Sequence, residues 1–407
     1  MSYAPIPMVP GPTTVHPKVL QAMSADFGSG QIEPGFLDCY HDVGKRLGKL
    51  MGSSGDVVLM TGEGMLALWA GLKSCLKPGD PVVSVGTGVF GDGIGDMAAS
   101  FGCRVVKVSL PYDSTIENGD SLHIIAEAIR RARPVMITAV HCETPSGTLN
   151  PLAELGRPKQ ELGVPLFYVD AVASVGGTPV LADEWNVDLL LTGSQKCLSA
   201  PPSMSMVAVS HAAWERMGEV AYQGYDSLLP FRTVREDGRC PYTPYWHGVA
   251  ALDAAVAMIE EGGAENVFAR HERVAERCHT GLAKLGIELF TTLEAVDSPT
   301  VTAAGIPKGL TWKEWQGLLR EQGLIVSGSF GPMAGKVFRL GHMGTQADAG
   351  LMDRALAAVA RVTGVNSRTF PRLTNEIGNI QRTHNLWGDN ETGQDAMEPG
   401  LFRSQSY

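Results

Sequence analysis

The sequence lacks a long apolar run. No uncharged apolar stretch reaches the roughly 18 residues that a membrane-spanning helix requires. The opening MSYAPIPMVPGPTT has neither the basic start nor the apolar core of a signal peptide. We therefore expect a cytoplasmic protein that has no membrane partner.

Paired cysteines and clustered basic residues are missing as well. The seven cysteines are odd in number and never form a C-x-x-C pair, so neither a disulfide framework nor a zinc site is indicated. His41, His141 and His342 are too dispersed along the chain to predict a metal centre. The formal net charge is -10, and Lys and Arg are scattered, which argues against a nucleic-acid partner. We expect neither metal nor nucleic acid.

What the sequence does contain is a regular alternation of strand-like and helix-like segments. With 407 residues and 44% hydrophobic positions, the chain can form a large domain and a smaller one. Strands that are apolar on both faces and separated by helices are typical of a mainly parallel sheet covered on both sides. Between residues 55 and 210, the predicted strands are DVVLM, PVVSVG, CRVVKVSL, PVMITAVHC, PLFYVDAV, DLLLTG and MSMVAVS. The pattern predicts a seven-stranded α/β domain whose site lies at the carboxyl ends of the strands.

The second half of the chain changes character after a helical run that ends at a Gly pair near residue 262. Beyond it we expect a small α+β domain, with helices near residues 265–284, 311–321 and 348–362 and strands at IELF, TVTAAGI, GLIVSG and KVFRLG. The predicted organisation is an N-terminal segment (1–20), a large domain (21–262), a small domain (263–365) and a polar extension (366–407).

Two residues at strand ends suit vitamin B6 chemistry. Asp170 follows YVD, and Lys196 stands 26 residues later in TGSQKCLSAPP. A carboxylate beside a pyridine nitrogen keeps it protonated and makes the ring an electron sink. A lysine can form a Schiff base with the B6 aldehyde and then move the proton at the substrate Cα. We predict these two roles for Asp170 and Lys196.

The alternatives from the residues alone are a surface lysine and an aspartate in a turn. The small residues around Lys196 and the Ala-Pro-Pro that follows indicate a crowded loop, which favours the functional interpretation. Hydrolase chemistry is disfavoured because Ser146 and Ser199 have no suitable His and Asp partners at a nucleophile elbow. Cys197 beside the lysine is interpreted as a packing residue.

The order of motifs resembles the class V branch of fold-type I aminotransferases, which includes the alanine-glyoxylate and serine-glyoxylate enzymes. The resemblance covers residues 5 to about 365. It implies a large domain with a seven-stranded sheet, a smaller C-terminal domain, and pyridoxal 5'-phosphate or unphosphorylated pyridoxal or pyridoxamine as an aldimine on Lys196. The motifs are PGPT (10–13), TGEG (61–64), GVFGDGIG (88–95), HCETPSGTLNP (141–151), VDAVASVGG (169–177), TGSQKCLSAPP (192–202) and FRLGHMG (338–344).

The resemblance also implies roles for individual residues. Phe90 is expected to stack on one face of the pyridine ring, with Val172 on the other, and Thr144 to hydrogen-bond the phenolic oxygen. Arg339 is expected to bind the substrate α-carboxylate, a role that fits a bidentate guanidinium. Gly11, in the PGPT motif, is expected to contact the substrate.

One position departs from the phosphate-using members of the branch. There the loop before Gly64 presents a Ser or Thr to the cofactor phosphate at a helix N-terminus. Here Glu63 stands at that position, and two anions in one dry pocket would repel. A tyrosine that relatives supply from the neighbouring subunit, three residues before Thr243, is Cys240 here. The resemblance implies that Glu63, Gly64, Gln195 and Thr243 are cofactor-binding residues. These features resemble the pyridoxamine-pyruvate type, in which unphosphorylated B6 is a substrate.

Three other positions keep the alternatives open. Phe330 replaces the second arginine with which that type binds pyruvate, Phe90 replaces a tyrosine, and Gln195 is the residue that phosphate-using relatives favour. The expected reaction is pyridoxamine plus pyruvate to pyridoxal plus L-alanine, with a phosphate-dependent alanine- or serine-glyoxylate aminotransferase as the alternative. A lyase on the same fold is disfavoured because Arg339 suits a carboxylate that is retained. The expected partners are a small amine, a 2-oxo acid and further copies of the chain, as a homodimer or homotetramer.

Overall fold

The seven predicted strands form one sheet in the computed structural model, which describes residues 5–116 and 119–364. Their order is β2-β10-β9-β8-β5-β3-β4, and β10 alone runs antiparallel to its neighbours. The predicted α/β fold with a mainly parallel seven-stranded sheet is confirmed. The strands are β2 (Asp56–Thr61), β3 (Pro81–Gly86), β4 (Arg104–Ser109), β5 (Met136–Val140), β8 (Leu166–Asp170), β9 (Leu189–Gly193) and β10 (Met204–Val209).

The strands β5, β8, β9 and β10 are buried along their whole length, and since successive strand residues point to opposite sides, both faces are covered there. In β8, Leu166 and Tyr168 pack in one hydrophobic cluster, while Phe167 and Val169 pack in the other. Removing one such side chain from water contributes about 1.5–3 kcal/mol. The continuous apolar runs in the sequence are therefore explained by helices on each side.

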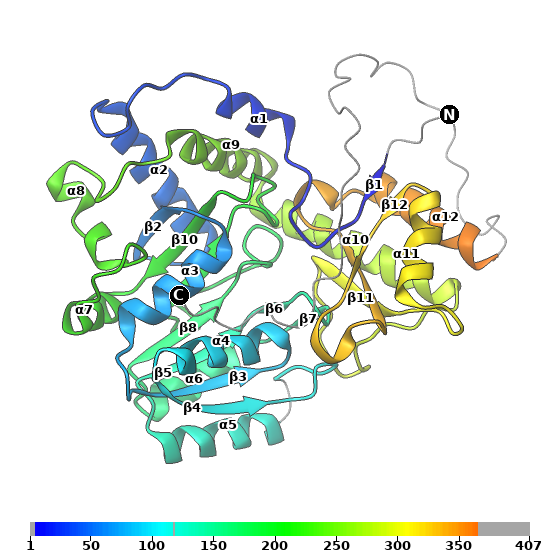
Figure 1. Cartoon of the computed structure of the whole chain (residues 1–407), viewed down its shortest axis with the longest axis horizontal. Helices are drawn as coiled ribbons and strands as arrows, with labels where there is room; N and C mark the ends of the chain where they lie inside the picture. Colours follow the sequence, from blue (N-terminus) through cyan, green and yellow to red (C-terminus); the bar gives the residue numbers. More distant parts are fainter. Residues whose placement is uncertain (1–4, 117–118, 365–407) are drawn as a thin grey trace.

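The helices of the first 262 residues divide between the two faces. The cluster that contains Phe167 includes side chains from α1, α2, α5, α6 and α9, and the cluster that contains Tyr168 includes side chains from α3, α4 and α7. Figure 1 shows this sheet and its helices on the left. The helices are α1 (Pro17–Met23), α2 (Gly35–Leu50), α3 (Gly64–Cys75), α4 (Val89–Ser100), α5 (Gly119–Ala132), α6 (Ala153–Glu161), α7 (His211–Val220), α8 (Val234–Asp237) and α9 (Trp246–Gly262).

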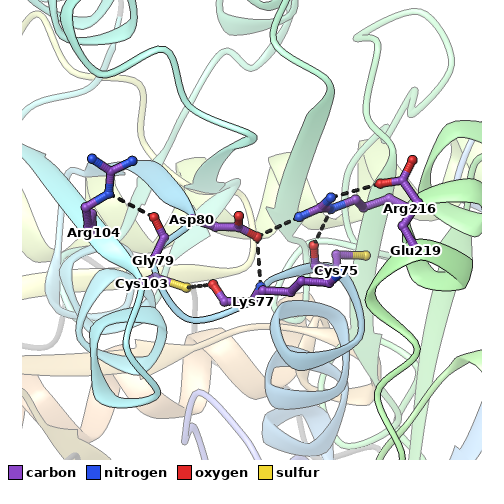
Figure 2. Close-up of polar contacts among 8 residues, drawn as sticks. All are labelled: Cys75, Lys77, Gly79, Asp80, Cys103, Arg104, Arg216 and Glu219. Carbon is purple, nitrogen blue, oxygen red and sulfur yellow. Dashed lines mark hydrogen bonds and ion pairs between the residues drawn. The ribbon is translucent and has the colours of Figure 1, made fainter.

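The loop between α3 and β3 is fixed by a set of polar contacts (Figure 2). Arg216 of α7 donates to the carbonyl of Cys75 at 3.0 Å and to the carboxylate of Asp80 at 2.6 Å. The same carboxylate accepts the backbone N–H of Lys77 at 2.8 Å. This arrangement anchors the C-terminal end of α3 against α7, so the position of its N-terminal end is set by a rigid helix.

The C-terminal elements form a second core, on the right in Figure 1. Trp315 is fully buried and packs edge-on against Phe338, with ring centroids 5.4 Å apart. Strand β1 (Ile6–Pro7) pairs with β12, so the start of the described chain belongs to this part. The elements are α10 (Ala264–Lys284), β11 (Val301–Gly305), α11 (Trp312–Glu321), β12 (Leu324–Ile325), β13 (Ser327–Gly328), β14 (Val337–Gly341) and α12 (Ala349–Thr363).

The strand expected at IELF is wrong. This segment forms only an isolated bridge, between Leu289 and Ala304. The chain then turns away, and the N–H of Thr292 donates to the carbonyl of Asp113 at 2.8 Å. Residues 287–290 have the apolar pattern of a strand. They pair with β11 at a single residue, however, and one bridge does not make a strand.

The boundaries expected at residues 20 and 262 remain predictions, and the predicted extension 366–407 lies outside the described residues. Within residues 5–116 and 119–364, no helix is both long and apolar enough to cross a bilayer.

Candidate active site

The loops that leave β8 and β9 meet at one cavity, at the carboxyl ends of these parallel strands. Asp170 is the last residue of β8, and Lys196 follows β9 by three residues. The cavity has a volume of about 130 Å³. It is lined by Glu63, Gly64, Met65, Leu68, Phe90, Cys142, Thr144, Asp170, Val172, Ala173, Gln195 and Lys196. Eight residues that the sequence predicted for the site therefore line one cavity.

Lys196 is enclosed by the N-terminal PGPT segment. Its Nζ donates to the carbonyl of Pro10 at 2.5 Å, and a Cβ at Gly11 would lie 2.7 Å from Nζ. Gly11 also has φ +90°, so both space and conformation require glycine there. Burial, and then the nearby Arg339 guanidinium, lower the pKa of Lys196 to about 8. A fraction of this lysine is therefore a neutral amine at neutral pH.

Asp170 is 6% exposed, and one carboxylate oxygen accepts the N–H of Val172 at 2.8 Å. Burial raises the pKa of Asp170 to about 6, so the carboxylate is ionised above that pH. A Cβ at Gly64 would lie 3.0 Å from a methyl of Val172. Gly64 thus lets the start of α3 approach Val172 and narrow the cavity.

Glu63 lies at the N-terminus of α3. Its backbone is extended, its side chain does not cap the helix, and its carboxylate accepts the Nε2 of Gln195 at 2.9 Å. The Oε1 of Gln195 is buried and has no hydrogen-bond partner. The amide of Gln195 is therefore oriented by Glu63, and this carboxylate belongs to the N-cap residue of α3.

Phe90 enters the cavity from the first turn of α4, and Thr144 from the segment after the short strand β6 (Cys142–Glu143). Glu143, the residue before Thr144, is fully buried. It accepts hydrogen bonds from the backbone N–H groups of Phe90 and Gly91. Sequence reasoning missed Glu143 and also the carbonyl of Pro10. The only sequence signal for Glu143 is a charged residue soon after an apolar strand.

Arg339 is 4% exposed on β14, and its hydrogen bonds in the described chain all go to carbonyl oxygens. They join Nε to Gly328 at 2.7 Å and Nη1 to Thr144 at 3.4 Å. Its guanidinium carbon lies 4.6 Å from the ring centroid of Phe330. Burial lowers the pKa of Arg339 to about 10, so it is charged at neutral pH. A buried cation without a carboxylate partner can bind an anionic ligand group.

Thr243 is not brought to this cavity. It lies in a separate cleft that it shares with Cys240 and Thr61. Among the described residues, no group of three or more His, Cys, Asp or Glu could hold a metal ion.

The Aminotransferase class-V family model matches residues 55–343. The chain belongs to this family. A pyridoxamine–pyruvate transaminase of Mesorhizobium japonicum is 30% identical over 84% of this chain and 87% of its own length. An uncharacterized aminotransferase of Methanocaldococcus jannaschii is 33% identical over 83% and 87%. The solved structure of an alanine–glyoxylate aminotransferase from Nostoc is 30% identical, with a TM-score of 0.83 over 89% of this chain and 96% of that one.

Membership in this family makes the protein an aminotransferase of fold type I, with a pyridoxal- or pyridoxamine-type cofactor. The residues of the cavity fit such a ring, since an amine, a carboxylate and an aromatic side chain line a narrow space beside Gly64. Glu63 occupies the N-cap position of α3, a place where an anion can bind, and its side chain forms no capping hydrogen bond.

Proposed function

We propose that this aminotransferase moves the amino group of pyridoxamine to pyruvate, giving pyridoxal and L-alanine. The observation that carries the proposal is the hydrogen bond between Gln195 Nε2 and the Glu63 carboxylate at the start of α3. A relative that is 30% identical carries the name pyridoxamine–pyruvate transaminase, which agrees with this assignment.

The charge of Glu63 supports an alcohol rather than a phosphate ester as the group recognised. A hydroxyl can donate a hydrogen bond to a carboxylate, whereas an ionised ester offers only acceptors. Two unit charges about 4 Å apart repel by about 4 kcal/mol at an effective dielectric near 20. The Gln195 amide that could neutralise part of this repulsion is already bound to Glu63.

The roles of the remaining residues follow from their environment. The B6 ring, when bound, supplies an electron sink for the carbon that loses its proton. Asp170, ionised above about pH 6, would hold the proton on the pyridine nitrogen. The neutral form of Lys196 Nζ would move the proton to and from the substrate carbon, and Arg339 would bind the pyruvate carboxylate.

A second candidate is a phosphate-dependent aminotransferase of the alanine–glyoxylate type. Gln195 favours it, because a side-chain amide at this place could bind a phosphate once released from Glu63. The structural match to the Nostoc enzyme agrees equally with this alternative.

We also propose at least a homodimer, in the cytoplasm. The position of Thr243, outside the cavity of its own chain, supports a contribution of this residue to the site of a neighbouring subunit.

Titration of the purified protein with pyridoxal and with pyridoxal 5'-phosphate, followed by absorbance, tests the proposal. The unchanged protein should bind pyridoxal more tightly, and Glu63→Ser should reverse the preference, with the ratio of the two dissociation constants changing by at least about a hundredfold. Glu161→Ser, which makes the same change at an exposed position, should leave the ratio unchanged. Stoichiometric binding of the phosphate ester without turnover of pyridoxamine would instead establish the second candidate.

A further inference from the structure

A buried carboxylate caps the helix that carries Phe90. Helix α4 begins at Val89, and Gly88 at its N-cap has no side chain to satisfy the free N–H groups. Glu143 takes this place from another element. Its Oε2 accepts the N–H of Phe90 at 3.2 Å, and its Oε1 accepts the N–H of Gly91 at 2.6 Å. A carboxylate at this position also interacts favourably with the helix dipole.

The glycines of the GVFGDGIG motif make room for this carboxylate. A Cβ at Gly88 would lie 2.5 Å from the Cδ of Glu143, which no real side chain tolerates. The backbone of Gly88 is extended, so space rather than conformation requires glycine there. A Cβ at Gly91 would lie 2.7 Å from the Cα of Gly86 and 3.2 Å from Glu143 Oε1. The motif therefore serves close packing around Glu143.

Burial, in contrast to the N–H groups of α4, disfavours the ionised form of Glu143. Glu143 is fully buried, and burial raises its pKa to about 8, although the N–H groups of Gly91 and Phe90 act in the opposite direction. Within residues 5–116 and 119–364, no Lys or Arg forms an ion pair with it. Both carboxyl oxygens act as acceptors for adjacent N–H groups, and a glutamine could offer an oxygen to only one of them.

The segment that carries Glu143 also binds the opposite wall of the site. The carbonyl of Thr144 accepts Nη1 of Arg339 at 3.4 Å, and the carbonyl of Pro145 accepts the hydroxyl of Ser329 at 2.7 Å. Ser329 precedes Phe330, whose ring packs on the Arg339 guanidinium. Residues 143–145 therefore connect the wall that holds Phe90 with the wall that holds Arg339.

We propose that Glu143 is a positioning residue, which fixes Phe90 over the B6 ring and couples its place to that of Thr144 and Arg339. The proposal depends on the proposed function only in that a B6 ring binds beside Phe90. It does not depend on whether that ring is phosphorylated.

A control residue lies at the opposite, amino-terminal end of strand β9. Asp188 is 6% exposed and lies before β9, at the end of this strand that is remote from Lys196. Its carboxylate accepts the N–H of Phe167 at 2.8 Å and the hydroxyl of Ser210 at 2.9 Å. It also forms an ion pair with Lys159 at 3.1 Å, which Glu143 lacks, so Asp188→Asn should destabilise the fold at least as much as Glu143→Gln without touching the cavity.

The experiment compares Glu143→Gln, Asp188→Asn and Phe90→Ala in the full chain, with unfolding temperature and the dissociation constant for pyridoxal as readouts. Glu143→Gln and Asp188→Asn should both lower the unfolding temperature. Only Glu143→Gln should weaken binding, by about tenfold, because a buried N–H of α4 loses its acceptor. In the Phe90→Ala background, Glu143→Gln should change binding less than about twofold, since it acts through Phe90.

Equal effects of Glu143→Gln and Asp188→Asn on binding, or additive effects of Glu143→Gln and Phe90→Ala, would overturn the proposal. If Glu143→Gln does not fold, Gly88→Ala displaces the carboxylate from the other side and should weaken pyridoxal binding in the same way. If the unchanged protein binds only the phosphate ester, the proposed function fails, and the same comparison made with the ester still tests Glu143.

Discussion

The pH dependence of the Lys196 amine gives a quantitative test of the site. With a pKa of about 8, roughly a tenth of the lysine is neutral at pH 7. With the ordinary value of 10.5 the neutral fraction would be about 0.0003, so burial and Arg339 increase it about three hundredfold. The rate at which the protein captures pyridoxal should rise about tenfold per pH unit below pH 8 and level off above it.

Stopped-flow absorbance after mixing with pyridoxal, between pH 6 and 9.5, measures this rate. N-acetyl-lysine in the same buffers reports the titration of pyridoxal itself, and Lys196→Ala gives the background. Arg339→Gln removes a positive charge that lowers the lysine pKa, so the midpoint should move upward. Arg339→Lys keeps the charge and should leave the midpoint near 8. A midpoint above 10 in the unchanged protein, or equal shifts in the two variants, would refute the reasoning.

Two further substitutions test the ring and carboxylate contacts. Asp170→Asn can still accept the Val172 N–H and should fold, but kcat should fall at least about a hundredfold because an amide cannot hold the pyridinium proton; a loss below tenfold would exclude this role. Phe330→Arg places a second guanidinium beside Arg339 and should lower KM for pyruvate about tenfold, whereas Phe330→Leu should not. An unchanged KM in Phe330→Arg would mean that this side chain does not face the substrate.

The large sheet could be predicted because its central strands are buried on both faces. Each predicted strand is a short segment rich in apolar residues, and the structure keeps all seven in one sheet. The segment IELF has the same local pattern and is not a strand, since its hydrogen bonding to β11 ends after one bridge. Apolar pattern thus specifies burial, whereas pairing depends on a partner strand that the sequence does not reveal.

The cavity residues were predictable where they carry chemistry or stand in a motif. Asp170 ends a strand, and Glu63 and Lys196 follow strands within three residues, so their convergence at the carboxyl ends follows from the topology of the sheet. Glu143 was not predicted because its function lies in reaching a helix that begins 54 residues earlier in the chain. The packing of Phe330 on Arg339 was missed for a similar reason, as it depends on the pairing of β13 with β14.

The proposed preference for a ligand without a phosphate group depends on the charges around the cavity. The carboxylates of Asp170 and Glu63 line it, and Lys196 and Arg339 bring positive charge close to it. A phosphate ester would add about 1.5 to 2 negative charges. In the described part of the chain, Glu63 forms no ion pair that could offset them, and its contact is the neutral amide of Gln195. Pyridoxamine adds no negative charge of this kind, and the carboxylate of a 2-oxo acid can be matched by Arg339. The proposed discrimination between the two B6 forms therefore rests on the charge of Glu63.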